Sequence, residues 1–204
     1  MRLSVKIGAA TPGAKLFGYC RENGLSGLEF MAGIPGMCGG WLAMNAGTKQ
    51  GCFCDAVESV TAMKPDGEIV ELSRGDLRAS YRECPGLRGM VALSVKLRLT
   101  QSTPEAVAAA MDSARAKRFD FGGMRTAGSV FKNPPGDKTA GQILDAAGCK
   151  GLRVGGAYVC ERHANIIAAD VGATASDILA LIGIMRKRAF DSSGVELELE
   201  VEVV

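Results

Sequence analysis

The sequence predicts an α+β fold, in which amphipathic helices and antiparallel strands occupy separate stretches of the chain. Apolar residues three and four positions apart indicate helices over 103–118 and 174–188. Short alternating runs joined by turn residues indicate strands over 56–73 and again over 90–99. A change of character near Gln101 divides the chain into an N-terminal region, 1–101, and a C-terminal region, 102–204.

Length and composition are those of an ordinary globular protein. The chain has 204 residues, of which 47% are hydrophobic and 23% charged, so it can bury a substantial core. The formal net charge of +2 is too small to indicate binding to nucleic acid or to an anionic membrane, since those functions need a concentrated basic face. No apolar run reaches membrane-spanning length. Partners of both classes are therefore excluded.

The cysteines and the histidine argue against a metal centre. Seven cysteines are scattered along the chain without a signal peptide, which favours a reducing cytoplasm and incidental, buried thiols. Cys52-Phe53-Cys54 holds the only close pair, and without a second pair or nearby histidines it falls short of a zinc site. The single histidine, His163, fits a structural side chain better than a Ser-His-Asp hydrolase. No metal is predicted.

The N-terminal region begins with a strand over 3–7. Thr11 and Pro12 then supply an N-cap and a first helical residue, and Asn23-Gly24 ends the helix. The strands over 56–63 and 68–73 form a hairpin, because Lys64-Pro65-Asp66-Gly67 has the residues of a tight turn. Tyr81-Arg82 lies in the loop that leads to the strand over 90–99, and loops are where chemistry is usually mounted.

A glycine-rich stretch runs from Ala32 to Gly51. Six glycines among small residues allow the backbone to pass close to a flat or charged ligand. A tight crossover packed against a sheet explains the same composition, and glycine alone does not separate these interpretations.

The C-terminal region starts with a helix opened by Thr103-Pro104-Glu105 and continues through irregular residues 119–126. A short helix over 139–147, strands over 157–160 and 166–169, and a last helix capped by Thr174 follow. Residues 195–203 alternate strictly between apolar residues and glutamates and predict an edge strand. The alternation alone does not single out one glutamate as functional.

The stretch Gly128-Ser129-Val130-Phe131-Lys132-Asn133-Pro134 carries a hydroxyl, an ammonium and a carboxamide behind a glycine. Core packing does not require that combination. Val130 and Phe131 can anchor the segment, while the proline stops a regular element from continuing. The alternative interpretation is a strand end followed by a polar loop.

Several separated motifs share one order with a known family. They are Gly27–Gly36, Gly39-Gly40, Met44–Gly47, Tyr81-Arg82, the Ser129 stretch and the terminal GVELELEVEVV. From about Val5 onward the chain resembles the MurB family, the UDP-N-acetylenolpyruvoylglucosamine reductases. Family members begin with a further small flavin-binding subdomain and a glycine-serine-asparagine loop, which we expect this sequence to lack. Thr48-Lys49-Gln50-Gly51 also replaces the usual Ala-Tyr-Gly-Gly.

The resemblance implies the fold and the reaction. It implies part of a PCMH-type FAD-binding domain over 1–101, followed by a MurB-type substrate-binding domain over 102–204. NADPH would reduce bound FAD, which would pass hydride to the enolpyruvyl group of UDP-N-acetylglucosamine enolpyruvate to give UDP-N-acetylmuramate. This oxidoreductase activity belongs to peptidoglycan synthesis, and so to cell-wall biogenesis, cell shape and cell division, in the cytoplasm. The alternative is a non-catalytic or truncated paralogue that binds a UDP-sugar without stable FAD.

The resemblance also assigns residues to roles. Arg82 would stabilise the negative charge and grip the substrate carboxylate, Ser129 would donate a proton, and Glu200 would be a protonated acid or hydrogen-bond partner. The substrate would contact Tyr81, Lys132 and Asn133. The expected FAD contacts are Gly33, Ile34, Pro35, Gly36, Gly39, Gly40, Asn45, Ala46 and Gly47.

Overall fold

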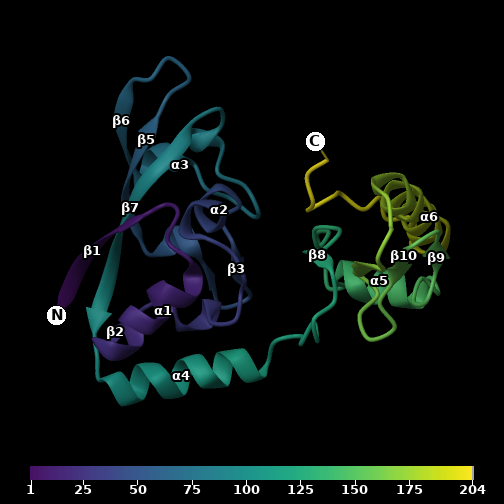
Figure 1. Ribbon diagram of the computed structural model, residues 1–204, viewed down its shortest axis with the longest axis horizontal. Helices are drawn as coiled ribbons and strands as arrows, with labels where there is room; N and C mark the ends of the chain where they lie inside the picture. The colour runs from purple at the N-terminus through teal and green to yellow at the C-terminus, as the bar shows by residue number, and fades with distance from the viewer. Residues whose placement is uncertain (204) are drawn as a thin grey trace. The chain divides into compact units, whose positions relative to one another are not determined.

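The computed structural model describes residues 1–203 and divides into two compact units, Met1–Phe119 and Asp120–Val204. The first unit is built on an antiparallel sheet in the order β1 (Arg2–Gly8), β7 (Val91–Gln101), β5 (Val57–Met63) and β6 (Ile69–Ser73), and β2 (Leu25–Ser26) also pairs with β7 (Figure 1). The predicted strands and hairpin are confirmed. The hairpin turn places Gly67 at a φ of 89°, where glycine carries no steric penalty.

Helices cover this sheet. α1 (Gly13–Glu22) packs against α4 (Pro104–Ala116), which also contacts the short turn η1 (Glu29–Met31). α4 begins as predicted, because the Thr103 hydroxyl accepts a hydrogen bond from the amide of Ala106 at 3.2 Å. The predicted Thr11 cap is wrong, since Pro12 is the N-cap of α1 and gives no side-chain hydrogen bond. Because α4 packs on the first unit, the units divide later than the boundary expected near Gln101.

The glycine-rich stretch contains a helix that the sequence analysis did not predict, α2 (Cys38–Ala43). It is held by Trp41, whose ring is buried between Phe17 and Phe53 at centroid distances of 5.4 and 5.8 Å. A Cβ at Gly13 would lie 1.9 Å from the Trp41 ring, so α1 must present glycine there. The remaining short elements are β3 (Gly47–Thr48), β4 (Gly51–Cys52), η2 (Phe53–Asp55), α3 (Arg74–Leu77) and η3 (Pro85–Leu87).

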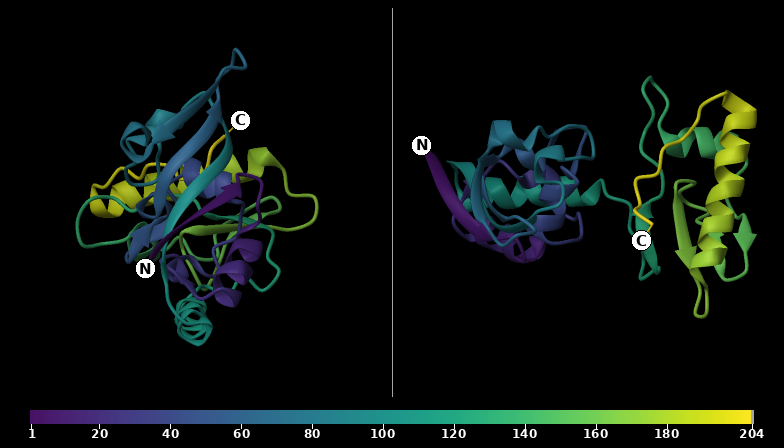
Figure 2. Two further views of the ribbon diagram at one scale, coloured as in Figure 1. Left: turned by 90° about the vertical axis from the view of Figure 1, so that its left-hand side faces the viewer. Right: turned by 90° about the horizontal axis from the view of Figure 1, so that it is seen from above.

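The second unit is a smaller antiparallel sheet in the order β8 (Thr126–Ser129), β11 (Ile166–Ala169), β10 (Ala157–Val159) and β9 (Arg153–Val154). α6 (Ala175–Ser193) packs on β9, β10 and α5 (Ala140–Ala146), as Figures 1 and 2 show in green and yellow. The predicted Thr174 cap is confirmed, because Thr174 forms a capping box with Asp177. Thr139, which was predicted only as the first residue of its helix, forms a capping box with Gln142.

The C-terminal segment, residues 195–203, corrects the sequence analysis. It forms no strand; Leu199 makes a single bridge to Phe131, and the flanking residues are irregular. The alternation predicted that the apolar residues face one side; this is confirmed as far as Val201, whereas Val203 is 59% exposed. Leu197 is buried, and Val195, Leu199 and Val201 pack on the core of the second unit. A strand needs a continuous hydrogen-bonded partner, and the irregular residues after Ser129 offer one only locally.

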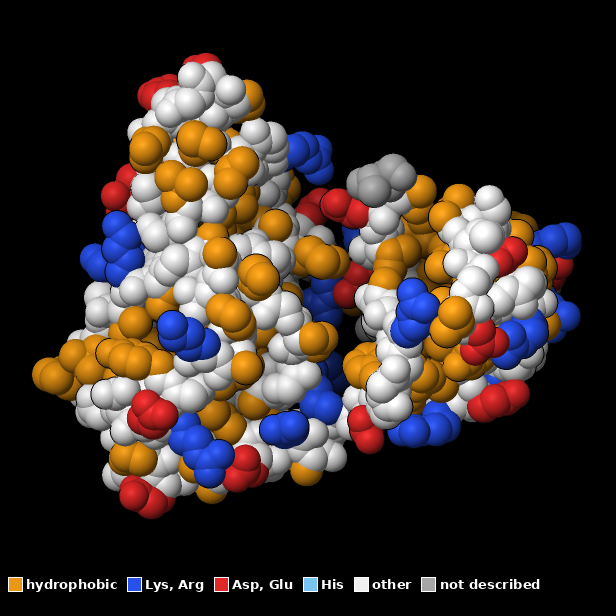
Figure 3. Space-filling view, in the orientation of Figure 1, with side chains coloured by type: hydrophobic (Ala, Val, Ile, Leu, Met, Phe, Trp, Pro, Cys, Tyr) orange, Lys and Arg blue, Asp and Glu red, His pale blue; other side chains and the backbone are white. Residues whose placement is uncertain are grey.

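Some apolar side chains of the first unit lie on its surface. Figure 3 shows them over the strands β5, β6 and β7, and the most exposed on these strands are Ile69, Val91 and Leu93. Among residues 1–203, no helix is both long enough and apolar enough to cross a membrane.

Candidate functional site

Packing inside the first unit explains most glycines of the 33–47 loop. A Cβ at Gly33 would approach Arg118 at 3.3 Å, and one at Gly39 would approach Ala9 at 3.0 Å. Gly36 has a φ of 126° and lies against Trp41. At buried Gly47 a Cβ would lie 2.3 Å from the carbonyl oxygen of Gly51. The tight-crossover interpretation therefore accounts for these positions.

Gly40 differs, because a Cβ there would meet nothing within 4 Å and the residue is exposed. It lies on α2 three positions after Met37 and four before Met44, whose side chains are 53% and 37% exposed. Met37 and Met44 are the N-cap and the C-cap of α2, so exposed apolar side chains stand at both ends of this short helix. An open glycine between exposed apolar side chains can accept a flat ring system, with adaptable methionines beside it.

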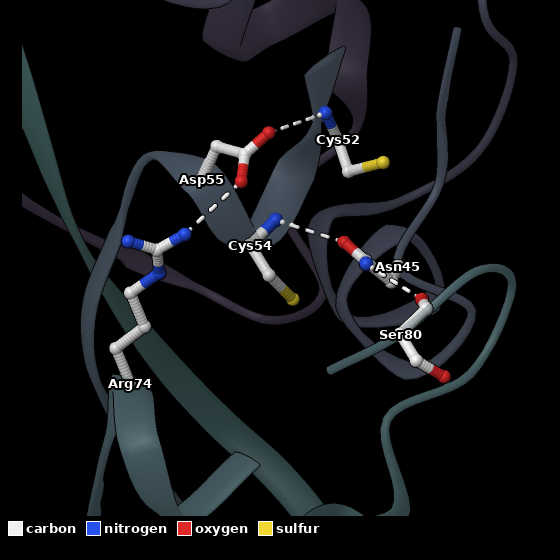
Figure 4. Close-up of polar contacts among 6 residues, drawn as sticks. All are labelled: Asn45, Cys52, Cys54, Asp55, Arg74 and Ser80. Carbon is white, nitrogen blue, oxygen red and sulfur yellow. Dashed lines mark hydrogen bonds and ion pairs between the residues drawn. The ribbon is translucent and has the colours of Figure 1, made fainter. Parts of the chain in front are cut away.

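The other predicted cofactor contacts stand around α2. Ile34 and Ala46 are partly buried and pack on the core, while the Pro35 carbonyl accepts a hydrogen bond from the Trp41 indole at 3.0 Å. Asn45 is 6% exposed and has a φ of 42°. Its Oδ1 accepts from the Cys54 amide at 3.1 Å, and its Nδ2 donates to the Ser80 carbonyl at 2.8 Å (Figure 4).

Tyr81 and Arg82 form the tip of a tight turn. Ser80 and Glu83 exchange backbone hydrogen bonds across it, and the Ser80 hydroxyl donates to the Glu83 carboxylate at 2.6 Å. Arg82 has a φ of 60°, a left-handed conformation that is uncommon outside glycine and asparagine. Its guanidinium donates to the Gly47 carbonyl at 3.1 Å and lies 4.9 Å from the centroid of the Tyr81 ring. The turn therefore holds a cation beside the glycine-rich loop.

In the second unit, Ser129 ends β8 with an exposed side chain. The preceding Gly128 has a φ of 86° and the following Val130 and Phe131 are buried, so the backbone is constrained on both sides of Ser129. Phe131 is held in turn by Asn165, which is 3% exposed. Asn165 Oδ1 accepts from the Phe131 amide at 3.0 Å, and its Nδ2 donates to the Phe131 carbonyl at 2.8 Å.

Lys132 and Asn133 continue this segment. The Lys132 ammonium pairs with the Glu198 carboxylate at 2.5 Å, and its backbone amide donates to the Glu198 carbonyl at 2.8 Å. Asn133 Oδ1 accepts from the amide of Ala140, at the start of α5, at 3.0 Å. Both residues are therefore held by their neighbours in the second unit.

Glu200 is positioned by the backbone pairing of residues 130–132 with residues 198–200. Its amide donates to the Val130 carbonyl at 2.8 Å, and its side chain is partly buried, whereas Glu196, Glu198 and Glu202 are exposed. The structure thus brings Glu200 beside the Ser129 segment in the second unit, while Arg82 and the FAD candidates belong to the first.

Two buried asparagines, Asn45 and Asn165, hold these segments in place, and neither role was predicted from the sequence. Asn45 was expected to contact the cofactor and Asn165 was given no role, yet both are buried and bonded to backbone. A polar residue that follows a motif and is flanked by apolar residues is the available signal for Asn165. His163 Nδ1 accepts from the Asn165 amide at 3.2 Å, and burial lowers the pKa of its imidazole, in keeping with a structural role.

The cysteines are all free thiols, and Cys52 alone among them is partly exposed. Burial raises the pKa of Cys20 and of Cys54 to about 12, so these thiols stay protonated and inert at neutral pH.

Comparison with known proteins identifies both units. Residues 119–204 match the family model of the UDP-N-acetylenolpyruvoylglucosamine reductase C-terminal domain, and residues 2–73 match that of an FAD binding domain. The chain is 39% identical to the UDP-N-acetylenolpyruvoylglucosamine reductase of Erythrobacter litoralis over 98% of its own length and 62% of that protein. It is 41% identical to that of Desulfosudis oleivorans, over 97% of the chain and 66% of the relative.

The chain is also similar to a third reductase and to a solved structure. The reductase of Moorella thermoacetica is 39% identical over 99% of this chain and 67% of its own length. The crystal structure of UDP-N-acetylenolpyruvylglucosamine reductase (MurB) from Thermus caldophilus superimposes with a TM-score of 0.84 at 36% identity, covering 98% of this chain and 72% of that one. The chain thus spans a little under two thirds of its first relatives, and it belongs to the UDP-N-acetylenolpyruvoylglucosamine reductase, or MurB, family.

Proposed function

We propose that this protein reduces UDP-N-acetylglucosamine enolpyruvate to UDP-N-acetylmuramate, with FAD as cofactor and NADPH as hydride source. The observation that carries the proposal is the pairing of the Ser129 segment with the Glu200 segment inside the second unit. The backbone pairing joins the segment that carries the Ser129 hydroxyl to the segment that carries the Glu200 carboxyl group, and protonation of a substrate carbon needs groups of this kind. The names of the relatives support the same reaction. It belongs to peptidoglycan precursor synthesis in the cytoplasm, which the free thiols favour.

The first unit fits a flavin. The helix α2 leaves Gly40 open between the exposed side chains of Met37 and Met44, and the loop around Gly36 is exposed. These residues, with Gly33, Ile34, Pro35, Gly39, Ala46 and Gly47 forming the loop beneath them, are where we propose that FAD is held. When bound, FAD would supply the hydride.

The chain's own residues would manage charge and proton. Hydride addition to the vinyl carbon leaves negative charge on the adjacent carbon, beside the substrate carboxylate. Arg82, through a permanently charged guanidinium with several donors, would hold that carboxylate and stabilise the charge. Ser129 Oγ–H would protonate the adjacent carbon and regain its proton from water, and Glu200 would hydrogen-bond the reacting group. Tyr81, Lys132 and Asn133 would bind the sugar and diphosphate.

The test uses Ser129→Ala in the full-length protein. Stopped-flow absorbance should show reduction of the flavin by NADPH nearly unchanged, while its reoxidation by the enolpyruvyl substrate slows by roughly 10²–10⁴-fold, the usual worth of a general acid. Ser4→Ala is the control, because Ser4 is an exposed strand serine that donates to Glu58. It should leave both half-reactions unchanged. Unaltered reoxidation in Ser129→Ala would remove Ser129 from the mechanism.

A binding measurement separates this function from a non-catalytic nucleotide-sugar binder. Calorimetry with UDP-N-acetylglucosamine should give binding, and the purified protein should carry flavin absorbance at 1:1 stoichiometry. Binding of the sugar without flavin or turnover would favour the non-catalytic protein.

A further inference from the structure

Asn45 connects two segments that are far apart in the sequence. Its carboxamide reaches from the Cys54 amide, just after β4, to the Ser80 carbonyl, which opens the Tyr81-Arg82 turn (Figure 4). In residues 1–203 the buried polar side chains are Asn45 and Asn165, so a buried carboxamide is rare in this fold. An amide is kept in such a place when it satisfies backbone groups that lack strand partners.

A second link joins the same two segments. The Arg82 guanidinium donates to the Gly47 carbonyl at 3.1 Å, and Gly47 pairs with Cys52 across β3 and β4. The backbone of Arg82 is meanwhile held at a φ of 60°. A non-glycine residue in this left-handed conformation is strained, and it persists only where the surrounding structure fixes it. Asn45 holds one end of the turn, at Ser80, through a hydrogen bond from a buried side chain whose oxygen is itself bonded to the Cys54 amide.

We propose that Asn45 is a positioning residue that fixes the Arg82 turn to the glycine-rich loop, and is not a ligand of the cofactor. The proposal rests on the function proposed for Arg82. The carboxamide is 6% exposed, and its oxygen and its nitrogen both serve the protein's own backbone. Losing the Nδ2 donor would leave the Ser80 carbonyl without this partner and widen the range of positions that Arg82 samples. Such a loss of alignment lowers turnover without changing cofactor binding.

The discriminating variant is Asn45→Asp in the full-length protein. Aspartate tolerates the left-handed conformation and can still accept from the Cys54 amide, but it cannot donate to Ser80. The matched control is Asn23→Asp, which removes one donor bond from an exposed asparagine to the Tyr19 carbonyl at 2.9 Å. Native-state hydrogen exchange of residues 80–83 should be about tenfold faster in Asn45→Asp, the effect of losing one hydrogen bond, and unchanged in Asn23→Asp.

Kinetics then separate positioning from a general structural defect. Asn45→Asp should lower kcat for the enolpyruvyl substrate about tenfold or more while the dissociation constant of FAD and the rate of flavin reduction stay as in the parent. In an Arg82→Ala background the same substitution should have no further effect on turnover, because there is no guanidinium left to position.

The outcomes are distinct. Equal exchange at residues 80–83 in Asn45→Asp and Asn23→Asp would overturn the proposal. So would a fall in FAD affinity, or an Asn45→Asp effect that is additive with Arg82→Ala. If the parent protein shows no turnover, the proposed function has failed, and the exchange measurement alone decides whether Asn45 holds the turn.

Discussion

At the scale of single residues, Asn45 and Asn165 each replace a missing strand neighbour. A carboxamide offers the donor and the acceptor of a peptide group, and Asn165 uses both on the same residue, Phe131. This allows an irregular segment to be buried without unsatisfied N–H and C=O groups. Ser129 and Lys132 can therefore flank the two buried residues Val130 and Phe131, with Ser129 exposed and Lys132 partly exposed.

We expect Asn165→Ala to destabilise the second unit by about 2–5 kcal/mol, because the buried amide and carbonyl of Phe131 both lose a partner. Urea unfolding followed by circular dichroism measures the difference. Asn23→Ala, which removes an exposed hydrogen bond to Tyr19, should cost less than about 1 kcal/mol. Similar costs for the two variants would mean that the Asn165 brace contributes little.

The left-handed backbone conformation of Arg82 costs conformational free energy, and a comparison of two substitutions measures that cost. Arg82→Gly and Arg82→Ala both remove the bond to Gly47 and the contact with Tyr81, but only glycine relaxes the left-handed φ. We expect the glycine variant to be about 1 kcal/mol more stable than the alanine variant in denaturant titrations. Both should turn over the substrate more slowly than the parent protein. Equal stabilities would show that the turn holds no strain at this position.

At the scale of elements, short-range signals were predictable and long-range ones were not. Thr103 and Thr174 cap their helices within three residues of sequence, so the pattern alone revealed them. The helix α2 escaped prediction because glycines at 39 and 40 weaken its propensity, and burial of Trp41 in the core stabilises it instead. Residues 195–203 have the alternation of a strand but only one bridge, at Leu199.

In the candidate site, too, features encoded by a local motif were predictable and long-range contacts were not. The positions of Ser129 and Arg82 followed from motifs, because each motif is a continuous stretch of chain. The contacts of Asn45 with Ser80 and of Asn165 with Phe131 join residues 35 and 34 positions apart, and no local pattern encodes them. The glycines could not separate a ligand-facing loop from a tight crossover, since packing requires Gly39 and Gly47 whether or not a ligand binds.

The connection between β10 and β11 should be sensitive to pH. Burial lowers the pKa of His163, with a smaller effect from the charge of Lys150, so the folded state disfavours the protonated imidazole. The stability that depends on neutral His163 is complete above the unfolded pKa of about 6.5 and is lost as pH falls through the lower folded pKa. Unfolding free energies measured from pH 8 to pH 5 should decline, and His163→Gln should flatten that slope. An equally steep slope in the variant would assign it to other groups.

At the scale of the whole molecule, the chain consists of two units that each enclose a separate hydrophobic core. The first core includes Trp41 and Phe53, and the second includes Phe131 and Leu181. Residues 119–125, where the first unit ends and the second begins, contain no helix or strand.

We expect limited trypsin digestion to cut first at Lys117 or Arg125 and to release two fragments that resist further cleavage. Exposed, irregular connections are preferred protease sites, whereas Arg118 is held by bonds to the carbonyls of Phe30 and Ala32. Mass spectrometry of the first products identifies the cut. An initial cut inside either core would contradict the independence of the units.

The division between Phe119 and Asp120 also affects which hybrids between two family members can fold. Each core draws its side chains from one continuous stretch, so a crossover between two family members at this peptide bond would leave every core with a single parent. Hybrids joined there should fold as readily as their parents, and exchanging the second stretch alone would transplant the Ser129 and Glu200 segments together as one inherited block.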